Sequence, residues 1–96
     1  MLFTFDPEKS ARNAAERGLP FERVRDMDWQ NSYIVEDTRR DWGEPRYKAF
    51  GVMDGRLHIA VFTPRDDTIR IISFRRASRS EERMYAEERP GRTARR

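Results

Sequence analysis

The sequence predicts a two-layer α+β domain, in which two helices from the start of the chain and one from its end pack on an antiparallel β-sheet. Three observations predict it. Helix-start signals occur near both ends of the chain, apolar residues alternate with a period of two between positions 32 and 75, and turn residues separate the alternating runs. The expected order of elements is therefore β-α-α-β-β-β-β-α.

The first strand and the first two helices follow from local signals. Leu2 to Phe5 alternates weakly and predicts a short strand. Asp6 is suited to cap a helix, Pro7 to occupy its first position and Gly18 to end it. We expect this helix to bury a stripe made of Ala11, Ala14, Ala15 and Leu19. A shorter helix opens at Pro20, and its apolar face is formed by Phe21, Val24, Met27 and Trp29.

Four runs with a period of two predict the remaining strands, which we place at residues 32–36, 46–53, 56–63 and 68–75. Trp42 to Pro45 reads as a turn, and Asp54-Gly55 is a strong hairpin signal. Pro64 to Asp67 predicts another turn. The run Ile69 to Ile72 suits a central strand that is buried on both faces.

The C-terminal helix opens at a capping box formed by Ser78 and Glu81, and it ends at Pro90. Ninety-six residues leave room for one domain. We place this domain at residues 1–90, and we expect residues 91–96 to form a short, basic, flexible tail.

The composition excludes several classes of protein. Charged residues make up 39% and hydrophobic residues 36%, which approaches the composition of disordered chains, but eleven aromatic residues in apolar blocks favour a folded domain. The chain has no cysteine and one histidine, so neither disulfides nor a zinc site is expected. It has no apolar run of membrane-spanning length and no secretion signal at its start. We therefore expect a cytoplasmic protein without a metal or another cofactor.

Positive charge is concentrated near the end of the chain. From Arg75 onward there are eight arginines and four glutamates, a local balance of +4, whereas the preceding 74 residues carry 12 basic and 13 acidic groups. The basic residues are 18 arginines and two lysines. Arginine suits bidentate phosphate contacts, although a GC-rich genome would produce the same bias without any function.

The first cluster of candidate site residues is Glu44-Pro45-Arg46-Tyr47-Lys48, at the start of a predicted strand. Arg46 and Lys48 share one face because side chains alternate along a strand. A carboxylate beside two cations is suited to act as a general base. Residue types alone favour the alternative, in which these side chains form a cross-strand charge ladder facing solvent.

The second cluster is the junction where the last predicted strand runs into Arg75, Arg76 and a helix start. Guanidinium groups and free helix N–H groups there point at one volume, which suits a phosphate. Alternation places Arg75 on the face of Ile69 and Ile71, and Arg76 on the opposite face. The alternative is that both arginines extend to solvent at the edge of the sheet.

The third cluster lies on the last helix. Arg79 and Arg83 align at a spacing of four residues, and Tyr85 is suited to stack on a base, although packing of its ring on the sheet is the commoner arrangement. His58 would suit a proton shuttle, but it lies within a predicted strand, and we expect it to be structural or merely exposed.

Four ordered blocks of residues cover positions 3 to 88. They are Phe5-Asp6-Pro7-Glu8-Lys9 with Asn13; Gly18-x-x-Phe21-Glu22; Gly43-Glu44-x-Arg46-Tyr47 with Gly51; and Arg70-Ile71-Ile72-Ser73-x-Arg75-x-Ala77 followed by Glu82-Arg83-x-x-Tyr85. In order and spacing they resemble the BrnT family. The chain departs from that pattern at Glu16-Arg17, where Lys-His is usual, and at Phe74, where alanine is usual beside the presumed site.

This resemblance implies a toxin of a type II toxin–antitoxin pair. BrnT proteins are similar in fold to RelE-type ribonucleases, cleave RNA and stop translation. Their partner, BrnA, resembles a ribbon-helix-helix DNA-binding antitoxin that covers the toxin and represses the shared operon, so that operator DNA is contacted through the antitoxin.

The leading hypothesis is thus a metal-independent endoribonuclease, in which the 2′-hydroxyl of the RNA attacks the adjacent phosphate. We expect Arg75 and Arg79 to clamp that phosphate with help from Arg46, Glu44 to be the base, and Tyr85 to orient the strand. Further RNA contacts are expected from Lys9, Lys48, Arg76 and Arg83. The alternative is a small binding domain for nucleic acid or protein, without catalytic activity.

Overall fold

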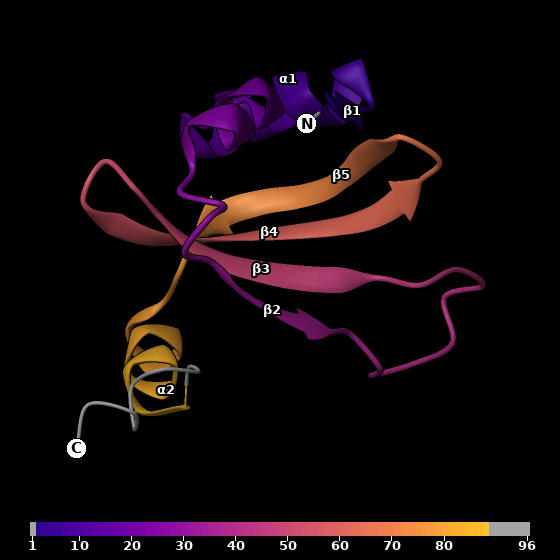
Figure 1. Cartoon of the computed structure of the whole chain (residues 1–96). Coiled ribbons are helices and arrows are strands. Elements are labelled where there is room, and N and C mark those ends of the chain that lie inside the picture. The colour runs from indigo at the N-terminus through magenta and orange to yellow at the C-terminus, as the bar shows by residue number, and fades with distance from the viewer. Residues whose placement is uncertain (1, 89–96) are drawn as a thin grey trace.

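The computed structural model describes residues 2–88 and has the expected α+β composition (Figure 1). Its elements are β1 (Leu2–Phe5), α1 (Pro7–Arg17), the 3₁₀ helix η1 (Phe21–Asp26), β2 (Tyr33–Glu36), β3 (Tyr47–Met53), β4 (Arg56–Arg65), β5 (Thr68–Arg76) and α2 (Arg79–Glu88). The expected helix end at Pro90 and the tail at residues 91–96 lie outside the described residues. Within residues 2–88 no helix has the length and apolar character needed to cross a membrane.

The local signals act as expected at both ends of α1 and at the start of α2. The Asp6 side chain accepts a hydrogen bond from the backbone N–H of Glu8 at 2.9 Å, and Gly18 ends α1 with a φ of 68°. Ser78 and Glu81 form the predicted capping box. Ser78 Oγ accepts from the N–H of Glu81 at 3.2 Å, and Glu81 Oε1 accepts from the N–H of Ser78 at 2.8 Å.

Two expectations for the N-terminal helices are wrong. The second helix is a 3₁₀ helix, which agrees with the three-residue spacing of its apolar side chains because a 3₁₀ helix has 3.0 residues per turn. The alanine stripe of α1 does not form the buried face, since Ala11 and Ala15 are exposed. Ser10 is buried instead, and its hydroxyl accepts from the N–H of Phe21, while the Asn13 amide donates to the carbonyl of Phe74. Helix α1 thus docks on η1 and β5 through polar side chains.

The sheet is mixed, so the expectation of an antiparallel sheet is wrong. Its strand order is β1-β5-β4-β3-β2, and β1 pairs in parallel with β5, with Phe3 opposite Ile69. The other three pairings are antiparallel. The parallel pair joins the two ends of the domain, which no local pattern encodes. Strand β4 also continues through Pro64 to Arg65, so its hairpin to β5 turns at Asp66 and Asp67.

The helices lie on opposite faces of the sheet, so the expectation of two layers is wrong as well (Figure 1). We call the two faces the α1 face and the α2 face. The α1 face carries the larger apolar cluster, whose buried members are Leu19, Phe21, Val24, Met27, Ala49, Met53, Ala60, Phe62, Ile71 and Phe74. On the α2 face, Phe50, Leu57 and Ile59 are buried against Ala77 and Tyr85. Figure 1 shows α2 near one end of the strands, with the β2–β3 loop at the other end.

A bulge in β5 decides which side chains reach the α2 face. Val61 is opposite Ser73 and Phe62 is opposite Ile71, so Ile72 is an extra residue in β5. Beyond the bulge, Phe74 pairs with Ala60 on the α1 face, and Arg75 pairs with Ile59 on the α2 face. The expectation that Arg75 shares a face with Ile69 and Ile71 is therefore wrong, because the extra residue reverses the alternation.

Candidate functional site

Basic side chains from three parts of the chain gather on the α2 face. Lys48 of β3 is opposite Val61, which is opposite Ser73 of β5, and Arg75 follows two residues later on the same face. Arg46 lies two residues before Lys48, as the alternation predicted, and its carbonyl accepts from the N–H of Asp37 at 2.7 Å. Arg39 lies close enough for its charge to act on Arg75. We call Arg39, Arg46, Lys48 and Arg75 the cationic face.

Arg75 is held by a carboxylate of the helix that follows it. Its Nη1 and Nη2 atoms donate to Glu81 Oε1 and Oε2, both at 2.8 Å. The same pair lowers the pKa of Glu81 to about 2, mainly through hydrogen bonds from Arg75, and raises the pKa of Arg75. Glu81 occupies the edge of the guanidinium that is formed by Nη1 and Nη2. The neighbouring edge is formed by Nε and Nη2, and within residues 2–88 its only hydrogen bond is the one from Nη2 to Glu81.

Glu81 also changes what the start of α2 can bind. From the sequence we expect free N–H groups at this helix start to meet a phosphate together with the arginines. The Glu81 carboxylate instead accepts the N–H of Ser78, so an internal anion occupies part of that volume. The phosphate-binding capacity of this corner therefore resides in Arg75 rather than in the helix start.

A second ion pair fixes the other side of the cationic face. Asp37 is buried, and Arg39 donates to both of its oxygens at 2.9 Å. These hydrogen bonds are the main reason that the pKa of Asp37 falls to about 2, and the charge of Lys48 lowers it further. Asp37 thus remains ionised above its lowered pKa and holds the guanidinium of Arg39 in place.

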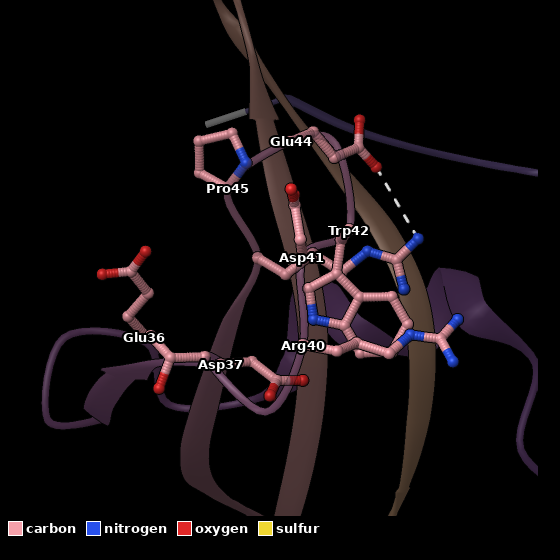
Figure 2. A pocket seen from close by; sticks show the side chains of 9 residues that line it. Glu36, Asp37, Arg40, Asp41, Trp42, Glu44 and Pro45 are labelled. Atoms are coloured by element: carbon pink, nitrogen blue, oxygen red, sulfur yellow. Dashed lines mark ion pairs between the residues drawn. The ribbon is translucent and has the colours of Figure 1, made fainter.

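Glu44 contacts two cations, as expected, but one of them is a different residue. Its Oε1 is 3.2 Å from Arg65 Nη2. Its Oε2 is 3.7 Å from Arg46 Nη2, and Figure 2 marks this second ion pair by a dashed line. Lys48 is not among its ion-pair partners within the described residues. Arg65 comes from the end of β4, so the contact has the cross-strand character of the charge-ladder alternative, while Glu44 remains about 29% exposed and accessible to a ligand.

Glu44 and Arg75 lie at opposite ends of the cationic face. Between Arg46 and Arg75 the register passes Lys48, Val61 and Ser73. With about 7 Å for two residues along a strand and 4.8 Å between strands, the Cα atoms of Arg46 and Arg75 are roughly 17 Å apart. Only long side chains that extend toward Lys48 can therefore act on one phosphate from both ends.

The ring of Tyr85 packs on the sheet, the commoner of the two expected arrangements. It stacks on Phe50 with 6.0 Å between ring centroids, and the ring of Tyr33 is 6.4 Å away. A hollow of about 190 Å³ lies beside it and is lined also by Lys48 and Met84. Tyr85 thereby borders the cationic face from the side of α2.

The remaining candidate residues do not join the cationic face. Lys9 is exposed on α1, and Arg76 pairs in register with His58 and lines a hollow with Arg17 of α1. Arg79 and Arg83 are exposed on α2. The structure thus brings Arg46, Lys48, Arg75 and Tyr85 to one face, places Glu44 at its margin, and separates Lys9 and Arg76 from it.

The positions of His58 and Phe74 show that neither side chain lies on the cationic face. His58 is structural, as expected, because it is buried, its Nδ1 lies 2.9 Å from the carbonyl oxygen of Arg56, and its ring packs on Phe74. Phe74 was expected beside the site, and this is wrong. It is 1% exposed in the core of the α1 face, where the bulge directs it.

Arg39, Arg65 and Trp42 lie at the candidate site although no sequence pattern indicated them, and Glu81, which was expected only in the helix cap, also holds Arg75. Trp42 lies between guanidinium groups, with Arg40 at 4.1 Å and Arg46 at 4.3 Å from its ring centroid. A turn signal placed Trp42 correctly in a loop, but nothing local indicated that the loop folds back on Arg46. No three His, Asp or Glu side chains of residues 2–88 gather as a metal site requires.

Comparison with known proteins identifies the family of the chain. The family model described as "Ribonuclease toxin, BrnT, of type II toxin-antitoxin system" matches residues 5–81. The match extends from the end of β1 into α2 and includes every residue of the cationic face. No curated protein matches the chain. Since the match spans most of its length, the chain belongs to the BrnT family of ribonuclease toxins, whose type II systems pair each toxin with an antitoxin.

Proposed function

We propose that this protein cleaves RNA on its α2 face without a metal ion, and that the cleavage arrests translation in the cytoplasm. The observation that carries the proposal is the partly exposed edge of Arg75, held by Glu81 and facing the same surface as Lys48, Arg46 and Arg39. Positively charged groups fixed before the substrate arrives are suited to stabilise the charge of a phosphoryl transition state. As part of this proposal we regard the fold as similar to that of RelE-type ribonucleases.

The proposed reaction uses the RNA's own nucleophile. The 2′-oxygen forms a bond to the adjacent phosphorus, the bond from phosphorus to the 5′-oxygen breaks, and the products are a 2′,3′-cyclic phosphate and a 5′-hydroxyl. Arg75 and Lys48 would hold the non-bridging oxygens, with Arg46 assisting from the other end of the face.

Proton transfer is assigned to Glu44. Its carboxylate is partly exposed and fixed by Arg46 and Arg65, so it would accept the proton of the 2′-hydroxyl. The leaving 5′-oxygen would take its proton from a water molecule. Tyr85 would position the RNA strand at the opposite margin, and Arg79 and Arg83 would contact phosphates beyond it. Lys9 and Arg76 are assigned to RNA that passes the edge of the sheet, because they lie away from the α2 face.

The antitoxin is proposed to be a BrnA-like protein with a ribbon-helix-helix domain that contacts operator DNA. It would inhibit by covering the surface that includes Arg75, Arg79 and Arg83, with acidic side chains and a few apolar anchors. Hydrogen exchange on the pair measures this occlusion. If these three arginines stay as accessible in the silent complex as in the free toxin, inhibition must act from a distance.

The test of the proposed activity is RNA cleavage by the purified chain in EDTA, with analysis of product ends. We expect full activity in EDTA and 2′,3′-cyclic phosphate termini. Loss of cleavage in EDTA that Mg²⁺ restores would contradict the mechanism. Tight RNA binding without cleavage, together with harmless expression in the absence of the neighbouring gene, would instead favour the binding-module alternative.

A further inference from the structure

A hollow of about 500 Å³ lies on the α1 face, at the end of the sheet where β5 passes into α2. Its lining includes Arg17 from the end of α1, Asp54 from the β3–β4 hairpin, His58 from β4 and Arg76 from β5. We call it the His58 hollow. Because Arg76 follows Arg75 in β5 and points to the opposite face, an RNA strand that passes from Arg75 around this end of the sheet reaches the hollow.

The ring of His58 is held so that one of its nitrogens faces the hollow. His58 is 4% exposed, and its ring centroid lies 5.6 Å from that of Phe74. Nδ1 is 2.9 Å from the carbonyl oxygen of Arg56, which can only accept, so Nδ1 carries a proton and Nε2 of the neutral ring is an acceptor. Within residues 2–88 Nε2 makes no hydrogen bond, and the atoms there that are both unpartnered and closed to solvent belong to other residues. Nε2 therefore opens into the hollow that His58 lines.

Two unpaired guanidinium groups border the same hollow. Arg17 and Arg76 are exposed, and neither forms an ion pair within the described residues. The one carboxylate among the lining residues that the structure describes is that of Asp54, and Arg23 contacts it at 3.0 Å. Arg23 also contacts Asp26, so its charge is used by these two carboxylates. The charges left over are those of Arg17 and Arg76, and they favour an anionic ligand.

Contacts of the fold place these arginines beside His58. Arg76 is the register partner of His58 in the antiparallel pair of β4 and β5, so their Cβ atoms are about 5 Å apart on one face. Asn13 of α1 donates its side-chain amide to the carbonyl of Phe74 at 2.8 Å, which ties the end of α1 to β5 two residues before Arg76. This contact brings Arg17 to the hollow. Three groups from α1, β4 and β5 thus surround one volume.

We propose that the His58 hollow binds a ribose-phosphate unit of the RNA outside the cleaved bond, which rests on the proposed ribonuclease function. The phosphate oxygens accept from Arg17 and Arg76, and the ribose 2′-hydroxyl donates to Nε2 of His58. A phosphodiester alone has no proton to donate to Nε2, whereas a ribose carries that donor next to its phosphate. Since the 2′-hydroxyl distinguishes RNA from DNA, His58 is a residue that determines specificity for RNA.

The first test compares three ligands on the native full chain at one pH. The probes are uridine 3′-monophosphate and its 2′-deoxy and 2′-O-methyl analogues. The chain has a single histidine, so its ring C–H signals in the NMR spectrum report on the hollow without overlap from another histidine. We expect uridine 3′-monophosphate to shift these signals and to bind roughly fivefold more tightly than either analogue, as for one hydrogen bond. Equal affinities of the three ligands, or titrations that leave the histidine signals in place, would overturn the proposal.

Arg17→Ala and Arg12→Ala form a matched pair, because both are exposed arginines of α1 and only Arg17 lines the hollow. We expect Arg17→Ala to weaken all three ligands about threefold and Arg12→Ala to weaken them less than about 1.5-fold. Equal effects of the two variants would contradict the site.

His58→Asn removes Nε2 and retains an amide that can donate to the carbonyl of Arg56. Followed by the backbone amide signal of Ala77, which also lines the hollow, this variant should bind uridine 3′-monophosphate and the 2′-deoxy analogue equally. A retained preference would refute the role of His58, and the native comparison decides if the variant does not fold. RNA cleavage by the native sample separates the hypotheses. Cleavage without the ribose preference refutes the hollow alone, whereas the preference without cleavage refutes the ribonuclease function and supports the site.

Discussion

The two faces of the sheet differ in what their side chains do. On the α1 face, ten buried apolar residues from the sheet, from η1 and from the positions next to η1 form the larger core, and the polar groups there dock α1. On the α2 face, three buried apolar residues support α2, and two of the four cations there, Arg75 and Arg39, are held by Glu81 and Asp37. Burial on the first face stabilises the fold, whereas the second leaves functional groups accessible to solvent.

This difference shows how a small domain can separate stability from function. Strand alternation sends neighbouring residues of β5 to opposite faces, so Phe74 joins the core and Arg75 joins the cationic face. A substitution on one face should therefore change stability with little effect on the other face's chemistry, and the reverse should hold as well.

The largest effect is expected from Phe74→Ala, which leaves a cavity in the fully buried core of the α1 face. Truncation of a buried phenylalanine typically costs about 3–5 kcal/mol of unfolding free energy, which approaches the whole stability of a domain of this size. Urea unfolding measures this loss of unfolding free energy, and Ile34→Ala is the control because Ile34 is 46% exposed. Similar losses for both variants would mean that the α1 face is not the main source of stability.

Glu81→Gln should act on the rate rather than on the fold. Glutamine can keep the cap on Ser78 but cannot hold Arg75 by a charged bidentate contact, so we expect kcat to fall by up to about 100-fold. In an Arg75→Ala background the same change should have no further effect. Ser78→Ala is the control, since it weakens the cap by about 1 kcal/mol and leaves the ion pair in place. An additive loss in the double variant would show that Glu81 acts independently of Arg75.

The two lysines allow the RNA-binding contributions of the two faces to be compared with the same residue type. Lys48 lies on the cationic face and Lys9 is exposed on α1. We expect Lys48→Ala to weaken RNA binding several-fold and to reduce its salt dependence by about one phosphate contact, and Lys9→Ala to change both less. Titration of a non-cleavable RNA at several salt concentrations measures both quantities, and equal effects would place RNA on both sides of the sheet.

The smallest effect is expected on acid stability. Glu81 and Asp37 each have a pKa of about 2 in the fold, against ordinary values of 4.5 and 3.8. Because folding lowers both values, their contribution is fully present above about pH 4.5 and is lost as the pH falls toward 2. The free energy of unfolding should therefore decrease over that window, and Glu81→Gln should flatten the decrease. An unchanged slope in the variant would contradict the strength of the Arg75–Glu81 pair.

Local chemistry predicted most elements because their signals are short-ranged. Asp6-Pro7, Gly18, Asp54-Gly55 and the Ser78–Glu81 box each act within a few residues, and each is used as expected in the structure. Pairing between distant segments was not predictable in this way. The parallel contact of β1 with β5 and the bulge at Ile72 depend on how the whole sheet closes.

The candidate site was predictable to the same extent. Alternation placed Arg46 and Lys48 together correctly, because β3 has no bulge. It failed for Arg75, since one extra residue in β5 reverses the faces. Arg39 and Arg65 were missed because each reaches the site by pairing with a carboxylate, Asp37 or Glu44, and a single sequence carries no signal for which charges pair across a fold.

The central claim is that RNA is cleaved on the α2 face, and the neighbouring residues Arg75 and Arg76 test it most directly because they point to opposite faces. RNA cleavage rates of Arg75→Ala and Arg76→Ala are measured at matched folded concentrations. We predict a loss of about 100- to 1,000-fold for Arg75→Ala, as for removal of a transition-state donor, and less than about threefold for Arg76→Ala. Equal losses, or a larger loss for Arg76→Ala, would contradict the account.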